Sequence, residues 1–398
     1  MSQMLALTIV LAILYIGDIV ATRTKAWIPS VFVCAVLFLI GYWTFFPEDI
    51  VSIAGIGPVV ATMLMYLLIT NMGTLLSLKE LKNQWKAIVI SLAGIVGIIA
   101  TLFTIGAMIF DLKTMIVAVP PLVGGVVAAL VMSEGASAAG LEDLAVFAIV
   151  IYVIQGFAGY PITSIVLKRE AKRLLKEHQQ GTLHTISQVR EEENSATEQT
   201  EQPKLFRKIP ANYNTEYFKF FRLAFVGLLA YGTSTVLAPI VTVNALVLCL
   251  VFGVLASTFG FLEKQPLQKA NGFGFAIMGL MLFIFDGLKQ ATPEMLMRII
   301  VPLVVSIALA VVGMYIFSFI AGKILKVSPN LAFAVSLTAL YGFPADYILT
   351  NEVVKSSTTD EKEREMLLSR MLPPMLVGGF ISVTITSVIL AGIFVNWL

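Results

Sequence analysis

The sequence predicts an all-α polytopic membrane protein with about ten transmembrane helices, in two inverted five-helix repeats that each contain a re-entrant or broken helical hairpin. The composition gives the class. The chain of 398 residues is 58% hydrophobic and 13% charged, whereas soluble domains are about half apolar and about a quarter charged. Its mean hydropathy is +0.89. The spacing of apolar runs and the distribution of basic residues then predict the arrangement.

Apolar runs recur along the chain, and each of roughly 18–28 residues can cross a hydrocarbon core about 30 Å thick. They fall at 4–20, 27–46, 51–74, 87–110, 114–133 and 144–167, and then at 217–237, 240–262, 271–288, 296–322, 328–350 and 371–396. We therefore expect an N-terminal transmembrane repeat (1–167), a cytoplasmic polar linker (168–216) and a C-terminal transmembrane repeat (217–398). The linker has the composition of a disordered tether.

Several functional classes find no support in the composition. A formal net charge of +2 does not indicate a nucleic-acid partner. The two histidines, His178 and His184, lie in the polar linker, so we expect no histidine metal site or catalytic triad within the membrane. Cys34 and Cys249 lie in apolar runs and are expected to be buried thiols. We predict no enzymatic activity and no resident cofactor or metal other than a coupling ion.

Basic residues orient the chain, because Lys and Arg near the ends of spans favour the cytoplasmic side. They cluster after the first, third and last run of the first half, at Arg23, Lys25, Lys79, Lys82, Lys86, Lys168, Arg169, Lys172 and Arg173. For a protein of the cell membrane, this distribution places the N-terminus outside the cell and the linker in the cytoplasm. Between Lys86 and Lys168 the chain must cross an even number of times, yet three apolar runs lie there. One of the three does not cross.

The run least suited to lipid is "VPPLVGGVVAALVMSEGASAAG" at 119–140, in which Pro120 and Pro121 are expected to break a helix. Broken backbone survives at membrane depth only where it is buried in protein or lines a cavity. We predict a hairpin that enters from outside. The same parity argument makes 328–350 a second hairpin that enters from inside, with its break at Gly342 and Pro344. The alternative is that both segments cross the membrane.

The two halves share an order of elements: four spans, a broken segment and a fifth span. The last spans also share a short echo, "ITSIVL" at 162–167 and "ITSVIL" at 385–390. Five crossings in each half give the repeats opposite orientations. Inverted repeats with paired interrupted segments are typical of secondary transporters, whose sites lie near the bilayer midplane.

The chain resembles the glutamate:sodium symporter family in the order of its elements. "LLITNMGTLLSLKEL" at 67–81 is similar to the third span of that family, and Gly342, Pro344 and Asn351 fall where it carries Gly-x-x-Pro-Thr-Ala-x-x-Asn. Gly135 and the small residues to Gly140 occupy the place of its Gly-His-Gly-Thr motif, without the His and Thr. The resemblance implies sodium-coupled uptake of an acidic amino acid, with a fold that can form homodimers.

Two carboxylates at membrane depth are the main site candidates, because such groups are costly in lipid and usually functional. Glu134 is expected at the tip of the first hairpin, where it can hold a cation, a proton or a substrate ammonium; a place at the cytoplasmic rim is the alternative. Asp346 has the matching place in the second hairpin, as an ion ligand, a helix N-cap, or both.

Further candidates surround these carboxylates. The expected substrate-binding residues are Ser133, Glu134, Gly135, Ser137 and Asn351, and the expected ion-coupling residues are Glu134, Asp346, Thr350 and Asn71. Ser133 and Ser137 are four residues apart and share a helix face, where close packing is their alternative role. Gln155 is expected to donate a hydrogen bond to hairpin backbone.

The sequence thus predicts a secondary active transporter in the lipid bilayer that moves a small anionic or zwitterionic solute. The preferred interpretation is symport of glutamate or a related carboxylate coupled to Na⁺. The alternative coupling ion is H⁺. A cation/proton antiporter is the alternative, and a membrane enzyme or receptor subunit a third.

Overall fold

The computed structural model describes residues 1–74, 84–180, 213–237 and 245–398. These residues form helices and connecting turns, and no strand occurs among them. Six helical segments of this described part are long and apolar enough to cross a membrane: 3–23, 85–109, 142–179, 216–237, 299–325 and 361–397. The prediction of an all-α membrane protein is confirmed at this level. Lys79, Lys82, His184 and most of the predicted linker lie outside the described residues.

The long segments are built from a small number of elements. They are α1 (Gln3–Arg23), α6 (Trp85–Thr101) continued by η1 (Leu102–Gly106) and α7 (Ala107–Ile109), α10 (Glu142–Gln179), α12 (Glu216–Leu237), α16 (Pro293–Leu325), and α19 (Glu361–Gly379) continued by η6 (Phe380–Thr386), α20 (Ser387–Phe394) and η7 (Val395–Trp397). Both η1 and η6 are π-helical, so one long helix in each half of the sequence carries a π-helical stretch.

Shorter elements lie between them. They are α2 (Ser30–Thr44), α3 (Ile50–Ile53), α4 (Pro58–Gly73), α8 (Leu112–Leu122), α9 (Val126–Ala138), α13 (Ala245–Thr258), α14 (Pro266–Lys269), α15 (Phe273–Asp286), η4 (Gly287–Gln290), α17 (Pro329–Leu337), η5 (Thr338–Leu340) and α18 (Ala345–Ser357). The two predicted hairpins correspond to α8–α9 and to α17–α18, and in both of them the helices are too short to span a bilayer.

The chain folds into two compact units, and each draws on both halves of the sequence. Unit 1 comprises residues 1–50, 84–183 and 285–398, and unit 2 comprises residues 51–83 and 184–284. Both hairpins belong to unit 1, together with α6, α10, α16 and the long C-terminal helix.

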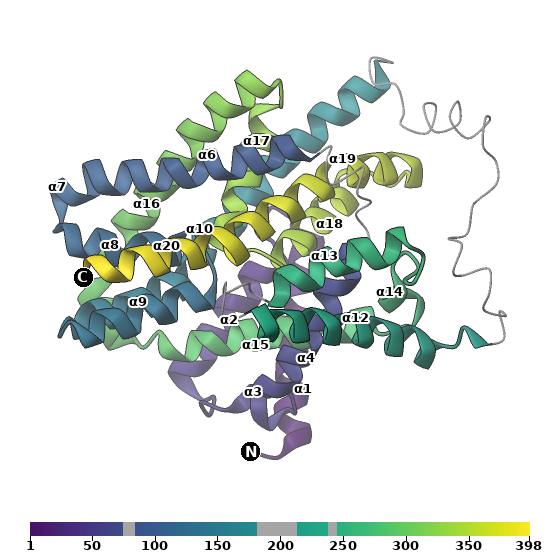
Figure 1. Ribbon diagram of the computed structural model, residues 1–398, viewed down its shortest axis with the longest axis horizontal. Coiled ribbons are helices and arrows are strands. Elements are labelled where there is room, and N and C mark those ends of the chain that lie inside the picture. The colour runs from purple at the N-terminus through teal and green to yellow at the C-terminus, as the bar shows by residue number, and fades with distance from the viewer. Residues whose placement is uncertain (75–83, 181–212, 238–244) are drawn as a thin grey trace. The chain divides into compact units, whose positions relative to one another are not determined.

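Unit 1 is built around the close crossing of α6 and α16, which Figure 1 shows in blue and green. A methyl group on Gly97 would lie 2.3 Å from the carbonyl oxygen of Gly313, so the two backbones touch. Thr101 Oγ1 donates to the carbonyl oxygen of Leu309 at 3.0 Å beside this contact. Small residues and a hydroxyl at the crossing allow the close packing that stabilises helix pairs in membranes.

Helix α10 runs past the expected end of its span. The sequence predicted a linker from Lys168, but the helix continues to Gln179. Glu170 has no exposed side-chain surface, and it accepts hydrogen bonds from Arg173 Nη2 at 2.7 Å and from Ser328 Oγ at 2.5 Å. Pairing at i,i+3 stabilises the added turns, and Ser328 caps α17. The basic end of α10 is therefore a structural part of unit 1.

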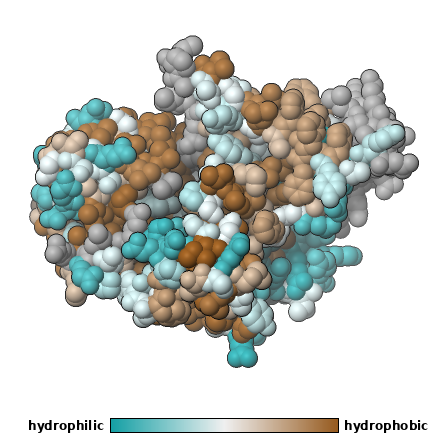
Figure 2. Space-filling model, turned by 90° about the horizontal axis from the view of Figure 1, so that it is seen from below, coloured by the Kyte–Doolittle hydropathy of each residue, from teal (hydrophilic) through white to brown (hydrophobic). Residues whose placement is uncertain are grey.

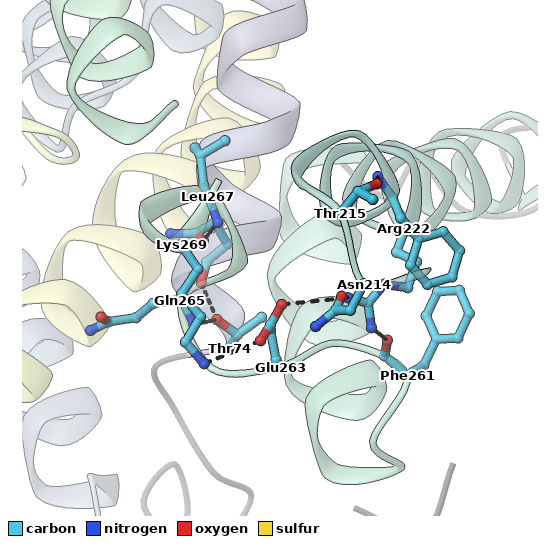
Figure 3. A network of polar contacts seen from close by, with 11 residues as sticks. Thr74, Asn214, Thr215, Arg222, Phe261, Glu263, Gln265, Leu267 and Lys269 are labelled. Carbon is cyan, nitrogen blue, oxygen red and sulfur yellow. Dashed lines mark hydrogen bonds and ion pairs between the residues drawn. The ribbon is translucent and has the colours of Figure 1, made fainter. Parts of the chain in front are cut away.

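Unit 2 packs α4 against α12 and α13. At one end, a polar network joins the loop after α13 to the neighbouring helices (Figure 3). The buried guanidinium of Arg222 donates to the carbonyl oxygen of Phe261 at 2.9 Å and to Asn214 Oδ1 at 2.8 Å. It also pairs with Glu263 at 3.4 Å, which in turn pairs with Lys269 at 3.2 Å. The network fixes how this end of unit 2 folds.

Apolar side chains are widely exposed, as expected for helices that face lipid. Figure 2 shows brown apolar atoms over much of the face drawn, interrupted by teal polar groups. Val59 is 84% exposed, Met108 87% and Ile324 74%. Exposed patches of this extent are unusual in a soluble monomer, which agrees with an integral membrane protein.

Candidate functional site

The first hairpin turns at two glycines rather than at its prolines. Gly124 and Gly125 have φ of +102° and +89°, and they separate α8 from α9. Residues with a Cβ rarely adopt such angles, so glycine is required there. Pro120 and Pro121 lie inside the last turn of α8. The predicted break at the prolines is wrong, because proline keeps a helical φ and cannot by itself reverse the chain.

The second hairpin breaks where the sequence predicted. Helix α17 and η5 end at Leu340, Gly342 has φ of +64°, and Pro344 precedes the first residue of α18. The Phe343–Pro344 peptide bond is cis. Gly342 and Pro344 thus lie at the interruption between η5 and α18. The backbone from Tyr341 to Pro344 lies outside helices and is buried or half-buried.

The two breaks meet at one point of the C-terminal helix. A methyl group on Gly124 would lie 2.5 Å from the carbonyl oxygen of Ala339 and 2.6 Å from Val383 Cγ2. One on Gly342 would lie 2.8 Å from the same Val383 Cγ2, and one on Gly125 would lie 2.6 Å from the carbonyl oxygen of Val383. Val383 belongs to the π-helical η6. Both hairpin tips therefore touch η6 and leave no room for side chains.

Helix α10 holds both hairpins by hydrogen bonds. Gln155 Nε2 donates to the carbonyl oxygen of Pro121 at 2.9 Å, close to the first tip. The hydroxyl of Tyr341, at the second tip, donates to Thr163 Oγ1 at 2.9 Å. The prediction that Gln155 binds hairpin backbone is confirmed. These contacts fix the two tips to one rigid helix.

Asp346 is a carboxylate next to the meeting point. Its side chain is completely buried in the first turn of α18. Its Oδ1 accepts a hydrogen bond from the Tyr347 N–H at 2.6 Å, while Oδ2 has no hydrogen-bond partner among the described residues. A methyl group on Gly379 would lie 2.6 Å from Oδ2. The unpaired oxygen thus faces the backbone of α19.

Such a carboxylate needs a compensating charge. An isolated buried charge costs several kcal/mol after relaxation, so it is stable only when it is paired or neutralised. A proton or a bound cation at Oδ2 would supply this, and the positive end of α18 adds a smaller contribution. The alternative of an N-cap is not realised, since Pro344 occupies the cap position and no side chain caps it.

Other predicted residues on α18 serve the helix itself. Thr350 is completely buried, and its Oγ1 donates to the carbonyl oxygen of Asp346 at 2.7 Å. Asn351 is half-buried, and its Nδ2 donates to the carbonyl oxygen of Tyr347 at 2.8 Å. Glu352, which was not among the predicted site residues, instead ties α18 to α2, because it accepts hydrogen bonds from the backbone N–H and the hydroxyl of Ser30. Thr350 therefore bonds the backbone carbonyl of Asp346 and not its carboxylate.

Glu134 does not lie at the hairpin tip. It is exposed and lies in the C-terminal part of α9, more than two turns beyond the break at Gly125. Because the break is at Gly124 and Gly125, the acidic residue falls on the returning arm. Of its predicted neighbours, Ser137 is exposed and donates to Glu142 at 2.9 Å, and Ser133 is half-buried. A methyl group on Gly135 would collide with Val395, so Gly135 is a packing position.

Asn71 belongs to unit 2, whereas the other predicted site residues belong to unit 1. It is completely buried, and its Oδ1 accepts a hydrogen bond from the Leu267 N–H at 2.9 Å. The neighbouring Thr74 Oγ1 accepts from the Gln265 N–H at 3.0 Å (Figure 3). These bonds fasten the loop before α14 to α4. Asn71 thus has a structural role in unit 2.

Three residues of the site were not predicted: Val383, Gly379 and Tyr341. Val383 and Gly379 are apolar residues in an apolar run and carry no local signal. Tyr341 directly precedes the predicted break at Gly342, and a buried tyrosine usually needs a partner for its hydroxyl. That signal was available in the sequence but did not identify Thr163 as the partner.

Comparison with protein-family models and with curated proteins finds no match to this chain. The geometry of the site and the fold therefore carry the functional argument.

Proposed function

We propose that this protein is a secondary active transporter whose substrate and coupling ion bind where the two hairpin tips meet. One observation carries the proposal: two broken hairpins, one from each half of the sequence, converge on Val383 beside the buried, half-paired carboxylate of Asp346. Broken backbone at depth next to a buried charge is typical of transporter sites.

A small carboxylate is the substrate class that this arrangement favours. Helices α9 and α18 both begin at the tips, at Gly125 and Pro344, and no side chain caps either of them. Free N–H groups in the first turn of a helix and the positive end of its dipole bind anionic groups. Helix α9 offers both, whereas in α18 the N–H groups of Asp346 and Tyr347 already donate to the carbonyl oxygen of Gly342 and to Asp346 Oδ1, so α18 offers mainly its dipole. We propose glutamate or a related acidic solute, in line with the resemblance to glutamate:sodium symporters.

Asp346 is proposed to hold the coupling ion. Na⁺ prefers oxygen ligands, which Oδ2 and the carbonyl groups of the broken segment 341–343 can supply. A cation there neutralises the buried carboxylate and leaves the hairpin ready for an anionic substrate. Movement of unit 1, which carries both hairpins, relative to unit 2 would then alternate access.

We further propose ten crossings in two inverted repeats. The matching features support this: a close crossing of α6 with α16, a glycine break in each hairpin, and α10 and η6 both touching hairpin tips. We propose that the end of α1 and the part of α10 around Lys168 face the cytoplasm; Lys168 Nζ lies 4.7 Å from the ring centre of Trp27, so these two basic segments are on the same side.

A cation/proton antiporter is the second candidate, and the unpaired Oδ2 of Asp346 favours it because that atom can carry a proton. In that case addition of Na⁺ alone would drive proton movement. A symporter needs the organic substrate as well.

Reconstitution of the purified protein in proteoliposomes distinguishes the two. We expect an inward Na⁺ gradient to drive accumulation of labelled glutamate or of another small carboxylate, and to produce no proton flux in the absence of substrate. Proton flux on addition of Na⁺ without an organic solute would favour the antiporter. Absence of gradient-driven flux for every acidic amino acid and carboxylate tested would contradict the symporter.

A further inference from the structure

A second candidate binding site lies where Lys168, at the end of the apolar part of α10, meets the loop that follows α1. Lys168 follows the apolar part of α10 directly, and Lys25 and Trp27 follow α1. The Lys168 ammonium lies over the indole of Trp27, 4.7 Å from the ring centre. Lys25 and Lys172 are within electrostatic reach of it. One lysine thus contacts the tryptophan, and two exposed lysines, Lys25 in the loop after α1 and Lys172 one turn further along α10, lie nearby in the chain.

Lys168 is buried without an anionic partner. Only 7% of its surface is exposed, and it forms no ion pair or hydrogen bond with any of the described residues. The nearest acidic residue along the helix, Glu170, is instead paired with Arg173 and Ser328. A buried cation beside two like charges is unfavourable unless an anion joins it. The cluster is therefore incomplete as a set of protein side chains.

The loop that carries Lys25 and Trp27 is held in place. Lys25 and Ala26 have backbone φ angles of +51° and +55°, which residues other than glycine rarely adopt. The carbonyl oxygen of Ala26 accepts a hydrogen bond from Ser164 on α10, and Ile28 N–H donates to Thr24 Oγ1 at 3.2 Å. The strained loop is thus fastened to α10, one turn before Lys168, so the geometry of the cluster is fixed.

The surroundings of the cluster identify the type of anion. Trp27 is 52% exposed and the adjacent Ile28 41% exposed, at the point where two apolar helices end. Tryptophan and lysine at the end of a span are typical of the headgroup region, and basic pockets between transmembrane helices bind acidic headgroups. A phospholipid places its phosphate at the lysines and its acyl chains along the exposed apolar surface.

We propose that Lys168, Lys25 and Lys172, with the indole of Trp27, bind the phosphate of an anionic phospholipid headgroup. The site is independent of the proposed transport function, because it requires only that the protein is embedded in a membrane. Bound lipid would neutralise Lys168 and hold the end of α1 against the part of α10 around Lys168.

Thermal unfolding of the purified full-length chain in detergent tests this site. The midpoint is measured against added phosphatidylglycerol, phosphatidylcholine or inorganic phosphate. We expect phosphatidylglycerol alone to raise the midpoint, since a ligand that binds the folded state stabilises it. In Lys168→Met, which keeps the buried stem, the apparent affinity for phosphatidylglycerol should fall at least about fivefold. In phosphatidylcholine alone this variant should be as stable as the wild type or more so.

Two further variants keep the test decisive. The double variant Lys25→Gln/Lys172→Gln leaves Lys168 in place and should also lose the rise in midpoint with phosphatidylglycerol. It therefore tests the proposal even if Lys168→Met fails to fold. Lys323→Gln removes one exposed charge at the end of α16 and should keep the full response. Equal losses in Lys168→Met and Lys323→Gln, or equal stabilisation by phosphatidylcholine or inorganic phosphate, would overturn the proposal.

Discussion

The two hairpins of unit 1 share a plan but differ in the chemistry of their tips. The first turns through Gly124 and Gly125 and carries its acidic residue, Glu134, in an exposed place on the returning arm. The second turns at Gly342 and buries Asp346 in the first turn after the break. At its tip, the first hairpin thus presents only backbone groups to a ligand, whereas the second presents backbone groups and a carboxylate. The repeated architecture does not require repeated function at equivalent carboxylates.

The difference follows from distance along the chain. Asp346 is two residues beyond Pro344, so its side chain stays at the tip, where α10 and α19 pack against α18. Glu134 is separated from the break by most of α9 and lies where unit 1 is open. A buried carboxylate must be neutralised, whereas an exposed one is solvated at little cost. Variants of each hairpin therefore test which of them carries the ion.

The largest effect is expected at Asp346. The substitution Asp346→Asn keeps the shape but removes the charge that would bind the ion. We expect Na⁺-driven uptake to fall about 100-fold or more, because an uncompensated buried ion costs ~3–5 kcal/mol. Initial uptake rates in proteoliposomes measure this. Asp143→Asn, at an exposed carboxylate in the first turn of α10, should transport normally. Normal uptake by Asp346→Asn would show that this residue does not hold the coupling ion.

The next effect concerns the close approach at the first tip. Gly124→Ala would place a methyl group 2.5 Å from the carbonyl oxygen of Ala339 and strain a φ of +102°. Overpacking costs ~1–3 kcal/mol and the strained backbone a further ~1–2 kcal/mol. We expect a lower unfolding midpoint and severely reduced uptake.

Gly140→Ala is the matched control for the first tip. Gly140 also has a positive φ, of +74°, but nothing lies within 4 Å of an added methyl group. It should therefore lose the strain contribution only. If both variants behave alike, backbone strain and not the meeting of the two tips is responsible.

A smaller effect is expected at Gly379, opposite Asp346. Gly379→Ala places a methyl group 2.6 Å from Oδ2 and should occupy the space of an ion bound there. We expect the Na⁺ concentration for half-maximal uptake to rise by about tenfold, equivalent to ~1.4 kcal/mol, with less change in protein stability. Gly392→Ala, with open space around it in α20, is the control. An unchanged Na⁺ dependence would place the ion elsewhere.

The smallest effect is expected at Glu134. Glu134→Gln alters an exposed side chain far from the break, so stability should change by less than about 0.5 kcal/mol. Uptake should stay within about twofold of the wild type. A loss comparable to that of Asp346→Asn would mean that both hairpins contribute carboxylates to the site. That result would support the prediction from the sequence that Glu134 and Asp346 have matching roles in the two hairpins.

Much of the architecture could be predicted from the sequence because lipid imposes simple rules. Apolar length predicts helices, and the two segments that the parity of basic loops singled out, 119–140 and 328–350, are built from short interrupted helices. The break at Gly342 and Pro344 and the hydrogen bond of Gln155 followed from local chemistry. The break of the first hairpin was misplaced because Pro120 and Pro121 are the stronger helix breakers in isolation, while Gly124 and Gly125 have the angles that reverse the chain.

The sequence by itself determined the helical membrane class, the interruption of the chain at Gly342 and Pro344, and Asp346 as a carboxylate within an apolar segment, since these depend on residue type and spacing. Only the tertiary structure decided that Val383 lies between the two tips, that Asp346 is enclosed while Glu134 is not, and that Asn71 belongs to unit 2. Those facts depend on contacts between segments far apart in the chain. Apolar side chains in lipid carry no local mark of which neighbour they will meet.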